Sequence, residues 1–151
     1  MREFLRPTAL EEFPIVVELP IQWSDLDAYG HVNNLAYLRW FENVRAVYAM
    51  KVGVSVTPQR EGLGAALAAI SCKYLRQLSF PGRIVAGARV TRMSIGGITL
   101  EFRIIDGQTG VPVAQGGCDA VIYDYAADKP VPIPEHIRTA VEKLEEKPFP
   151  A

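Results

Sequence analysis

The chain has 151 residues, of which 49% are hydrophobic and 22% are charged, with a formal net charge of −1 at pH 7. This length is typical of one domain that buries enough apolar surface to fold without disulfides or metals. The balance of apolar and charged residues argues against disorder. The nearly neutral charge offers no basic surface for nucleic acid, so we expect no partner of that class.

The chain shows no sign of export or membrane insertion. Its two cysteines, Cys72 and Cys118, have neither the spacing of a disulfide framework nor that of a zinc site, which suits a reducing compartment. The start of the chain, MREFLRPTALEEFP, lacks the apolar core of a signal peptide. No apolar run approaches the ~18 residues of a membrane span. We expect a cytoplasmic protein with one domain over residues 1–151, of which 1–14 form a loose arm.

The first regular element is predicted in the segment IVVELPIQW. Apolar and polar residues alternate there, which is typical of a half-buried strand. Pro20 cannot donate to a strand ladder, so the strand is expected at a sheet edge or with a bulge. The residues expected to face the core are Val17, Leu19, Ile21 and Trp23.

The hydrophobic period then changes to three and four residues in LAYLRWFENVRAVYAMK. This period predicts an amphipathic helix from about Asn34 to Lys51, and Gly53 follows as a stop signal. The apolar stripe that should pack into the core contains Tyr37, Trp40, Phe41, Val44, Val47 and Tyr48.

The rest of the chain is predicted to be mostly strand. A glycine-rich loop, EGLGA, precedes the strand segment LAAISCKYLRQLSF, which ends at a Pro81–Gly82 turn. Gly96–Gly97 and DGQTG mark two further turns, and Pro134 suits the first turn of a closing helix over 134–146. Strands joined by tight turns are antiparallel. We therefore predict an α+β fold, with an antiparallel sheet of about five strands wrapped around one long central helix.

The junction between the first strand and the long helix, WSDLDAYGHVNN, contains an unusual set of polar residues. Asn33 and Asn34 are good helix N-caps. The start of a helix also carries unpaired N–H groups with partial positive charge, which can stabilise an oxyanion. These residues therefore fit either a capped helix or an active site.

The aspartates just upstream have the same two interpretations. Asp25 and Asp27 share one face if the chain is extended there, and a carboxylate near a helix N-terminus can act as a base or nucleophile. The alternative is a solvated turn with local hydrogen bonds. Gly30 allows a tight turn and close approach of a ligand. His31 could shuttle protons or simply hydrogen-bond within the turn.

Several other chemistries lack their motifs. The sequence has no G-x-S-x-G elbow, no phosphate-binding P-loop and no set of histidines and cysteines suited to zinc. What remains is one carboxylate with backbone donors. This pair is sufficient to cleave an ester with a good leaving group, such as a thioester.

The segment DLDAYGHVNNLAYLRWFENVR closely resembles a motif of hotdog-fold acyl-CoA thioesterases, in the 4-hydroxybenzoyl-CoA thioesterase and YbgC-like branch. That motif reads D-x-D-x-x-G-H-V-N-N-x-x-Y-x-x-W/F-x-E-x-x-R. The segment SCKYLRQLSFPGRIVAG is similar to the family's second strand and the following turn. The resemblance implies a hotdog fold and homodimers joined edge to edge, commonly paired into homotetramers, with active sites at the dimer interface.

The resemblance also implies residue roles. Asp27 would be the catalytic carboxylate, as nucleophile or as base for water, and the backbone N–H of Asn34 would polarise the thioester carbonyl. The other residues expected to contact substrate are Gly30, His31, Asn33, Tyr37, Cys72 and Arg76. Tyr37 and Cys72 would line the acyl pocket unless they only pack in the core. Arg76 is one of several cations available to the phosphates of coenzyme A.

The expected function is hydrolysis of an acyl-CoA, with acyl carrier protein as an alternative carrier and no separate cofactor. Another hotdog branch uses a helix glutamate, but Glu42 can pair with Arg39 or Arg45 and is expected to be structural. Two alternatives stay open. One is a non-catalytic module that binds acyl thioesters. The other is a 3-hydroxyacyl thioester dehydratase, although His31 lacks the G-H-F-P-G context of those enzymes.

Overall fold

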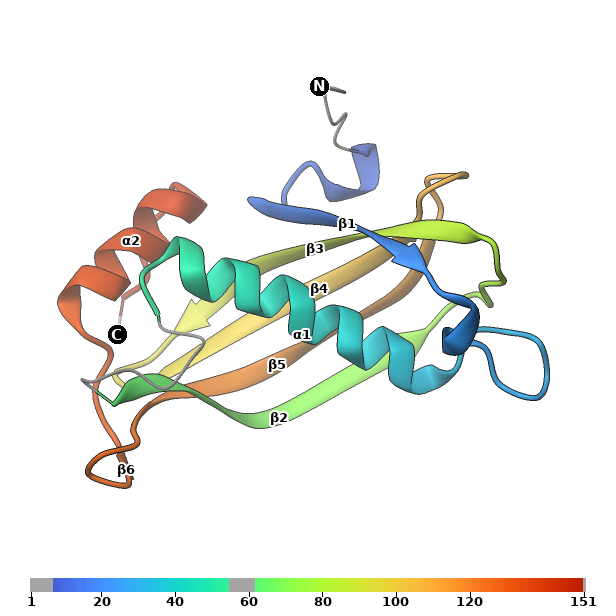
Figure 1. The fold of residues 1–151 in the computed structure, drawn as a ribbon. Helices are drawn as coiled ribbons and strands as arrows, with labels where there is room; N and C mark the ends of the chain where they lie inside the picture. Colours follow the sequence, from blue (N-terminus) through green and yellow to red (C-terminus); the bar gives the residue numbers. More distant parts are fainter. Residues whose placement is uncertain (1–6, 55–61, 151) are drawn as a thin grey trace.

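A computed structural model describes residues 7–54 and 62–150. One long helix lies across the concave face of a curled antiparallel sheet (Figure 1). In chain order the elements are η1 (Thr8–Leu10), β1 (Ile15–Ile21), η2 (Trp23–Asp25), α1 (Asn34–Lys51), β2 (Leu63–Tyr74), β3 (Gly82–Met93), β4 (Gly97–Asp106), β5 (Pro112–Asp124), β6 (Lys129–Pro130) and α2 (Glu135–Glu145).

The five long strands are ordered β1-β3-β4-β5-β2, and the two-residue β6 pairs with β5. Every pairing is antiparallel. The predicted α+β hotdog architecture is therefore confirmed. β1 is an edge strand, as Pro20 indicated, and β2 forms the other edge. The turn before Gly97 joins β3 to β4, as the paired glycines predicted.

The predicted helix is confirmed as α1. Asn33 is its N-cap, and its side-chain oxygen accepts a hydrogen bond from Leu35 N at 2.9 Å. Gly53, with a φ of +87°, stands just after its end. The stripe packs on the sheet as expected, and the Phe41 ring stacks on Phe102 of β4 with centroids 4.9 Å apart. Its buried members are Tyr37, Trp40, Phe41, Val44 and Tyr48, whereas Val47 is half-buried.

Two local predictions were wrong. Trp23 does not face the core, because the chain leaves the sheet after Ile21 and turns into η2, so its side chain is 75% exposed. The glycine-rich loop extends no further than residue 62, because Gly64 and Ala65 pair with β5, and β2 begins earlier than the predicted strand and ends at Tyr74 rather than at Phe80. Glu61 lies outside the described residues.

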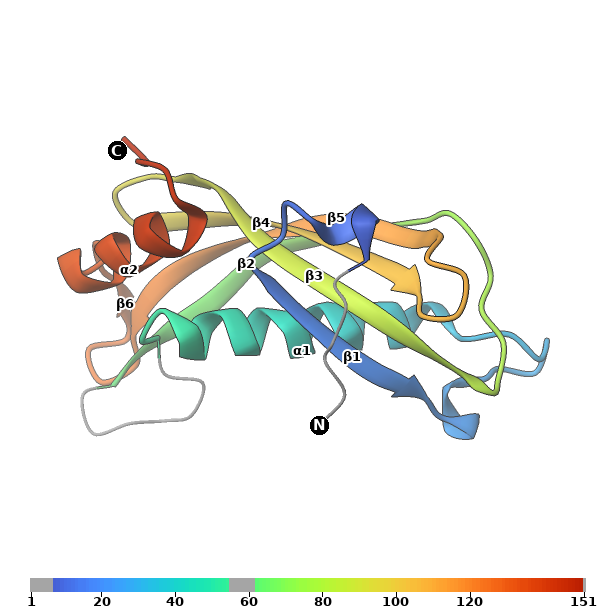
Figure 2. The same ribbon diagram turned by 90° about the horizontal axis from the view of Figure 1, so that it is seen from above.

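The N-terminal segment is packed rather than loose from residue 7 onward. Leu10 and Phe13 are buried against Val85 and Ile105, on the face of the sheet opposite α1 (Figure 2). Gly87 makes room for them, since a Cβ atom there would lie 2.9 Å from side-chain atoms of both Leu10 and Phe13. Residues 1–6 of the predicted arm are outside the described part of the chain.

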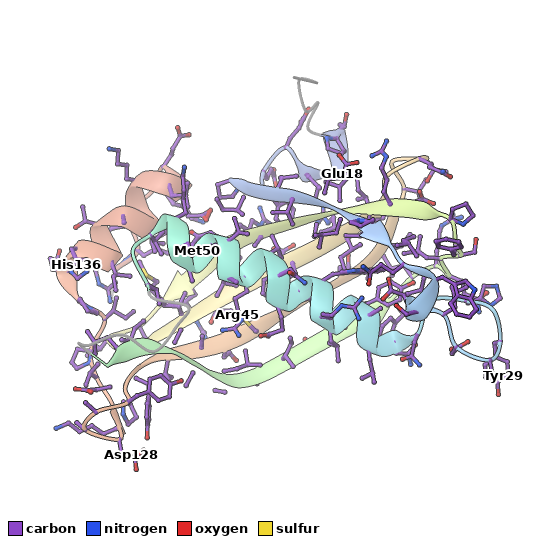
Figure 3. The ribbon with its side chains drawn as sticks, in the orientation of Figure 1. Glu18, Tyr29, Arg45, Met50, Asp128 and His136 are labelled. Atoms are coloured by element: carbon purple, nitrogen blue, oxygen red, sulfur yellow. The ribbon has the colours of Figure 1, made fainter. Side chains whose placement is uncertain are left out.

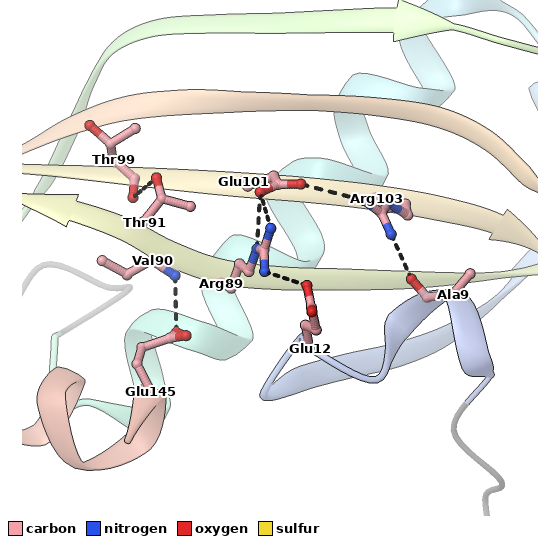
Figure 4. Close-up of polar contacts among 9 residues, drawn as sticks. All are labelled: Ala9, Glu12, Arg89, Val90, Thr91, Thr99, Glu101, Arg103 and Glu145. Atoms are coloured by element: carbon pink, nitrogen blue, oxygen red, sulfur yellow. Dashed lines mark hydrogen bonds and ion pairs between the residues drawn. The ribbon is translucent and has the colours of Figure 1, made fainter. Parts of the chain in front are cut away.

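Cations hold this segment in place (Figure 4). The guanidinium groups of Arg89 and Arg103 lie 5.0 and 5.1 Å from the centre of the Phe13 ring, within range of cation–π attraction. Arg103 also donates to Ala9 O at 2.8 Å, and Arg89 pairs with Glu12 at 3.0 Å. The segment therefore covers apolar surface of the sheet and contacts two cations of the sheet, one of which it pairs with a carboxylate.

We expect Phe13→Ala to lower the free energy of unfolding by about 3–5 kcal/mol, because it removes a fully buried aromatic ring. The matched control is Trp23→Ala, which should change the free energy of unfolding by no more than about 0.5 kcal/mol, because its ring is exposed. Urea unfolding of both variants at one protein concentration provides the measurement. Equal effects of the two substitutions would contradict the packing of this segment.

Candidate active site

A tight hairpin connects η2 to the start of α1. Leu26 and Val32 form an isolated antiparallel bridge. Asp27 N donates to His31 O, and Gly30 N donates to Asp27 O, each at 3.0 Å. Gly30 has a φ of +80°, a conformation that favours glycine. The hairpin therefore holds Asp27 at its base, a short distance from the first residues of α1.

Asp25 and Asp27 do not share one face, because Asp25 ends the 3-10 helix η2 and the chain is not extended there. Asp25 is 3% exposed, the one buried charged residue in the described part of the chain. Its Oδ2 accepts from Gln22 N at 2.7 Å, and its Oδ1 pairs with the Arg39 guanidinium on α1. Asp25 therefore fastens the loop to the helix.

Asp27 keeps one carboxylate oxygen available. Its Oδ1 accepts a hydrogen bond from Tyr29 N at 2.9 Å. None of the hydrogen bonds among residues 7–54 and 62–150 uses its Oδ2. The residue is half-buried. A free carboxylate oxygen at a partly covered position can bind a water molecule or approach an electrophile.

The first residue of α1 offers a backbone donor close by. Asn33 N donates to Asp25 O at 2.8 Å, which joins the hairpin to the helix start. The first N–H groups of a helix have no partner within the helix. The N–H of Asn34 donates no hydrogen bond to any described residue. This N–H lies at the positive end of an 18-residue helix. The position suits a carbonyl oxygen that gains negative charge.

Strand β2 contributes the next residues of the site. Tyr74 OH donates to Asn34 O at 3.2 Å, and Tyr37 OH donates to Arg76 O at 3.3 Å. The two tyrosine rings meet edge to face with centroids 5.2 Å apart. The Cys72 thiol lies beside both hydroxyl groups. The structure thus brings together four of the predicted residues around Tyr74: Asn34, Tyr37, Cys72 and Arg76.

The side chains of Tyr37 and Cys72 are neutral at physiological pH. Burial, together with the nearby Cys72 and Tyr74, raises the pKa of Tyr37 to about 12. Burial also raises the pKa of the Cys72 thiol. The thiolate is the nucleophilic form of cysteine, so Cys72 is poorly suited to attack a thioester. Asp27 is the better candidate for that role.

The remaining predicted residues take simpler positions. The side chain of His31 is half-buried and makes no hydrogen bond or ion pair within the described residues. The Arg76 side chain is exposed and carries no ion pair among them. Glu42 pairs with Arg45 at 2.6 Å, one of the two partners considered for it. In residues 7–54 and 62–150, no three His, Cys, Asp or Glu side chains gather as a metal site.

Sequence reasoning missed Arg39 and Tyr74. The position of Arg39 in the sequence does not indicate that it pairs with Asp25. The ion pair forms because the chain turns at Asp25 and directs its side chain toward α1. Tyr74 could have been found, because it follows Cys72 by two positions on one strand and must share its face. As for membranes, none of the described helices is long and apolar enough to cross one.

The comparisons with known proteins agree on one family. Residues 21–141 match the model of the thioesterase-like superfamily. A chloroplastic acyl-acyl carrier protein thioesterase of Arabidopsis thaliana, ATL2, is 26% identical over 124 residues, which cover 82% of this chain. The chain spans about 65% of the length of that relative.

Solved structures of thioesterases share the fold of this chain. A thioesterase from Thermus thermophilus, complexed with coenzyme A and Zn, has a TM-score of 0.82 and 26% identity, and the match covers 92% of this chain and 99% of that one. A 1,4-dihydroxy-2-naphthoyl-CoA thioesterase from Synechocystis shares the fold, with a TM-score of 0.74, 16% identity and coverage of 84% and 94%.

We expect Arg39→Met to lower the free energy of unfolding by about 1–3 kcal/mol, because it leaves a buried carboxylate oxygen of Asp25 without its partner. Combining it with Asp25→Asn should cost less than the sum of the single effects, as measured by a double-mutant cycle in urea. The control is Arg83→Met, whose ion pair with Glu18 is exposed on both sides. An additive cycle would contradict a structural coupling of Asp25 and Arg39.

Proposed function

Because the chain belongs to the thioesterase-like superfamily, we propose that it hydrolyses acyl-CoA thioesters with Asp27 as its catalytic carboxylate. The observation that carries this proposal is that a carboxylate oxygen and a backbone N–H without partners occur at the same strand–helix junction. Among residues 7–54 and 62–150, one oxygen of Asp27 and the N–H of Asn34 at the helix start have no hydrogen-bond partner. The Leu26–Val32 bridge closes the hairpin between these two groups and so limits how far they can move apart.

The reaction uses both groups. The thioester carbonyl oxygen accepts a hydrogen bond from Asn34 N–H, which stabilises the negative charge that develops on that oxygen. Asp27 then acts in one of two ways. It attacks the carbonyl carbon, expels the thiolate and forms an anhydride that water cleaves, or it removes a proton from a water molecule that attacks instead. Either route yields a free acid and coenzyme A.

The other predicted residues bind the substrate in this proposal. Gly30, His31 and Asn33 border the reacting carbonyl from the hairpin. Tyr37 and Cys72 line the entrance for the acyl group, and the exposed Arg76 is available to the phosphates of coenzyme A. No separate cofactor is needed, because coenzyme A is part of the substrate. Acyl carrier protein presents the same phosphopantetheine arm and is the alternative carrier.

We also propose that the active protein is a homodimer, or a homotetramer built from such dimers. β2 is an edge strand, so one side of its backbone is unpaired in the single chain. Its central residues are exposed and apolar: Leu67, Ala68 and Ala69. Such an edge is prone to pair with another strand, and a second copy of β2 would satisfy it. The two free thiols suit the cytoplasm as the proposed location.

We expect Asp27→Asn to lower kcat/KM for acyl-CoA by about 10²–10⁴-fold, the usual contribution of a catalytic acid or base, while the fold and acyl-CoA binding are retained. Thiol release from a panel of acyl-CoAs measures this loss. The control is Asp128→Asn, at the end of the molecule opposite the hairpin that carries Tyr29 (Figure 3). Full activity of Asp27→Asn would contradict the assigned role. Binding without thiol release from either carrier would favour the non-catalytic module.

A further inference from the structure

A second apolar space lies far from the helix start. It is an apolar cavity between the C-terminal half of α1, the sheet and α2. Three alanines from three elements leave this volume unfilled: Ala49 of α1, Ala65 of β2 and Ala120 of β5. Among the described residues that line it, Arg45 carries the only charged side chain. The proposed reaction at Asp27 and Asn34 does not use this cavity directly.

The far end of the cavity is closed by hydrogen bonds to α2. Tyr48, which lines the cavity, donates its hydroxyl to Glu145 Oε2 at 2.6 Å. Val90 N of β3 donates to the same oxygen at 3.0 Å. Val141 of α2 completes this wall. The cavity is therefore a fixed part of the fold at that end rather than a gap beside a loose helix.

No route leads from the helix start to the cavity directly beneath α1. Trp40 and Phe41 fill that space together with Phe102, and each is at most 2% exposed. Tyr37 is buried to the same extent. A ligand that enters at Asn34 must therefore pass beside α1.

A path exists along β2, which runs next to α1 from the helix start to its C-terminal half (Figure 1). Residues of β2 that face the helix lie opposite helix-facing residues of β5, as Ile70 lies opposite Cys118. Ile70 and Cys72 are only half-buried, and Leu67 is 40% exposed. The helix-facing side of β2 is thus an apolar, partly exposed strip between Tyr74 and Ala65.

The length of this path selects a class of acyl group. Asn34 and Arg45 are separated by about 16 Å along the helix, at 1.5 Å per residue. An extended alkyl chain advances roughly 1.3 Å per carbon, given C–C bonds of about 1.5 Å. Its thirteenth carbon or so would reach the mouth of the cavity, and the carbons beyond it would fill the cavity.

The charged residues next to the cavity, Arg45 and Glu42, favour an uncharged end of an acyl chain over a carboxylate. Arg45 is paired with Glu42 at 2.6 Å, which offsets its charge, while the buried Nε of Arg45 and Oε1 of Glu42 have no hydrogen-bond partner among the described residues. A free carboxylate placed there would meet the like charge of Glu42, whereas an uncharged alkyl end meets apolar walls. The cavity therefore suits a hydrocarbon tail.

We infer that this cavity receives the tail of a long-chain acyl group, of about 14–18 carbons, whose thioester carbonyl lies at Asn34. This inference rests on the proposed function, since it assumes that the carbonyl binds at the helix start. A second copy paired along β2 would lie beside this partly exposed strip.

The test fills the cavity and compares chain lengths. In Ala49→Phe, kcat/KM for hexadecanoyl-CoA should fall at least tenfold, whereas that for butanoyl-CoA should stay within about twofold. Substrates are kept below micelle-forming concentrations. The control is Met50→Phe, the neighbouring position, whose side chain is 56% exposed and does not line the cavity. If Ala49→Phe does not fold, as judged by circular dichroism, Ala120→Leu replaces it.

The outcomes separate this inference from the proposed function. Wild type that cleaves only short acyl-CoAs, or a filled variant that loses both substrates equally, overturns the inference and leaves thioester hydrolysis standing. Wild type that cleaves no thioester overturns the proposed function. Calorimetric binding of hexadecanoyl-CoA to Asp27→Asn, with and without Ala49→Phe, then tests the cavity alone. Weaker binding in the filled variant supports it, and unchanged binding overturns it.

Discussion

The site depends on how firmly the start of α1 is fixed. An 18-residue helix can present its first N–H groups to a ligand only if the chain before it is held still. Here the buried Asp25 carboxylate pairs with Arg39 one turn into the helix, and Asn33 both caps the helix and donates to Asp25 O. Val32 N also donates to Leu78 O at 2.8 Å, which ties the hairpin to the segment after β2. These contacts fix the orientation of the N–H group that we propose as the oxyanion donor.

The position of α1 on the sheet explains both the rigid and the open parts of the molecule. Helix-facing residues of β3 such as Ile84 and Ala86 are fully buried, whereas those of β2 such as Ile70 are not. The helix therefore packs tightly over one part of the sheet and leaves the β2 edge half-covered. The same asymmetry leaves the partly exposed strip of β2 that we propose for an acyl chain and the edge strand that we propose for a second copy.

Patterns that depend on near neighbours in the sequence could be predicted. The helical period and the Asn33 and Gly53 signals gave the bounds of α1, and Pro20 indicated an edge strand. Predictions failed where a distant partner decided the outcome. The packing of Phe13 depends on the open space above Gly87, and Gly64 joins a strand because β5 extends far enough to pair with it.

The same division holds for the candidate site. The motif located the hairpin, but spacing could not distinguish the two aspartates, because only the turn at η2 directs Asp25 toward Arg39. The cavity was also beyond prediction. It exists because Ala49, Ala65 and Ala120, which are far apart in the sequence, converge on one space.

The charges around the helix start favour one candidate catalytic carboxylate and one candidate oxyanion position. Tyr37 and Cys72 lie next to the first turn, and burial raises the pKa of both, so neither carries negative charge at physiological pH. Asp25 is already paired with Arg39. An oxyanion at Asn34 N–H would therefore meet a helix dipole and two neutral groups rather than a cluster of anions. Asp27 is thus the carboxylate with an oxygen left unpaired among the described residues, and it is the group that we propose to react with a bound thioester.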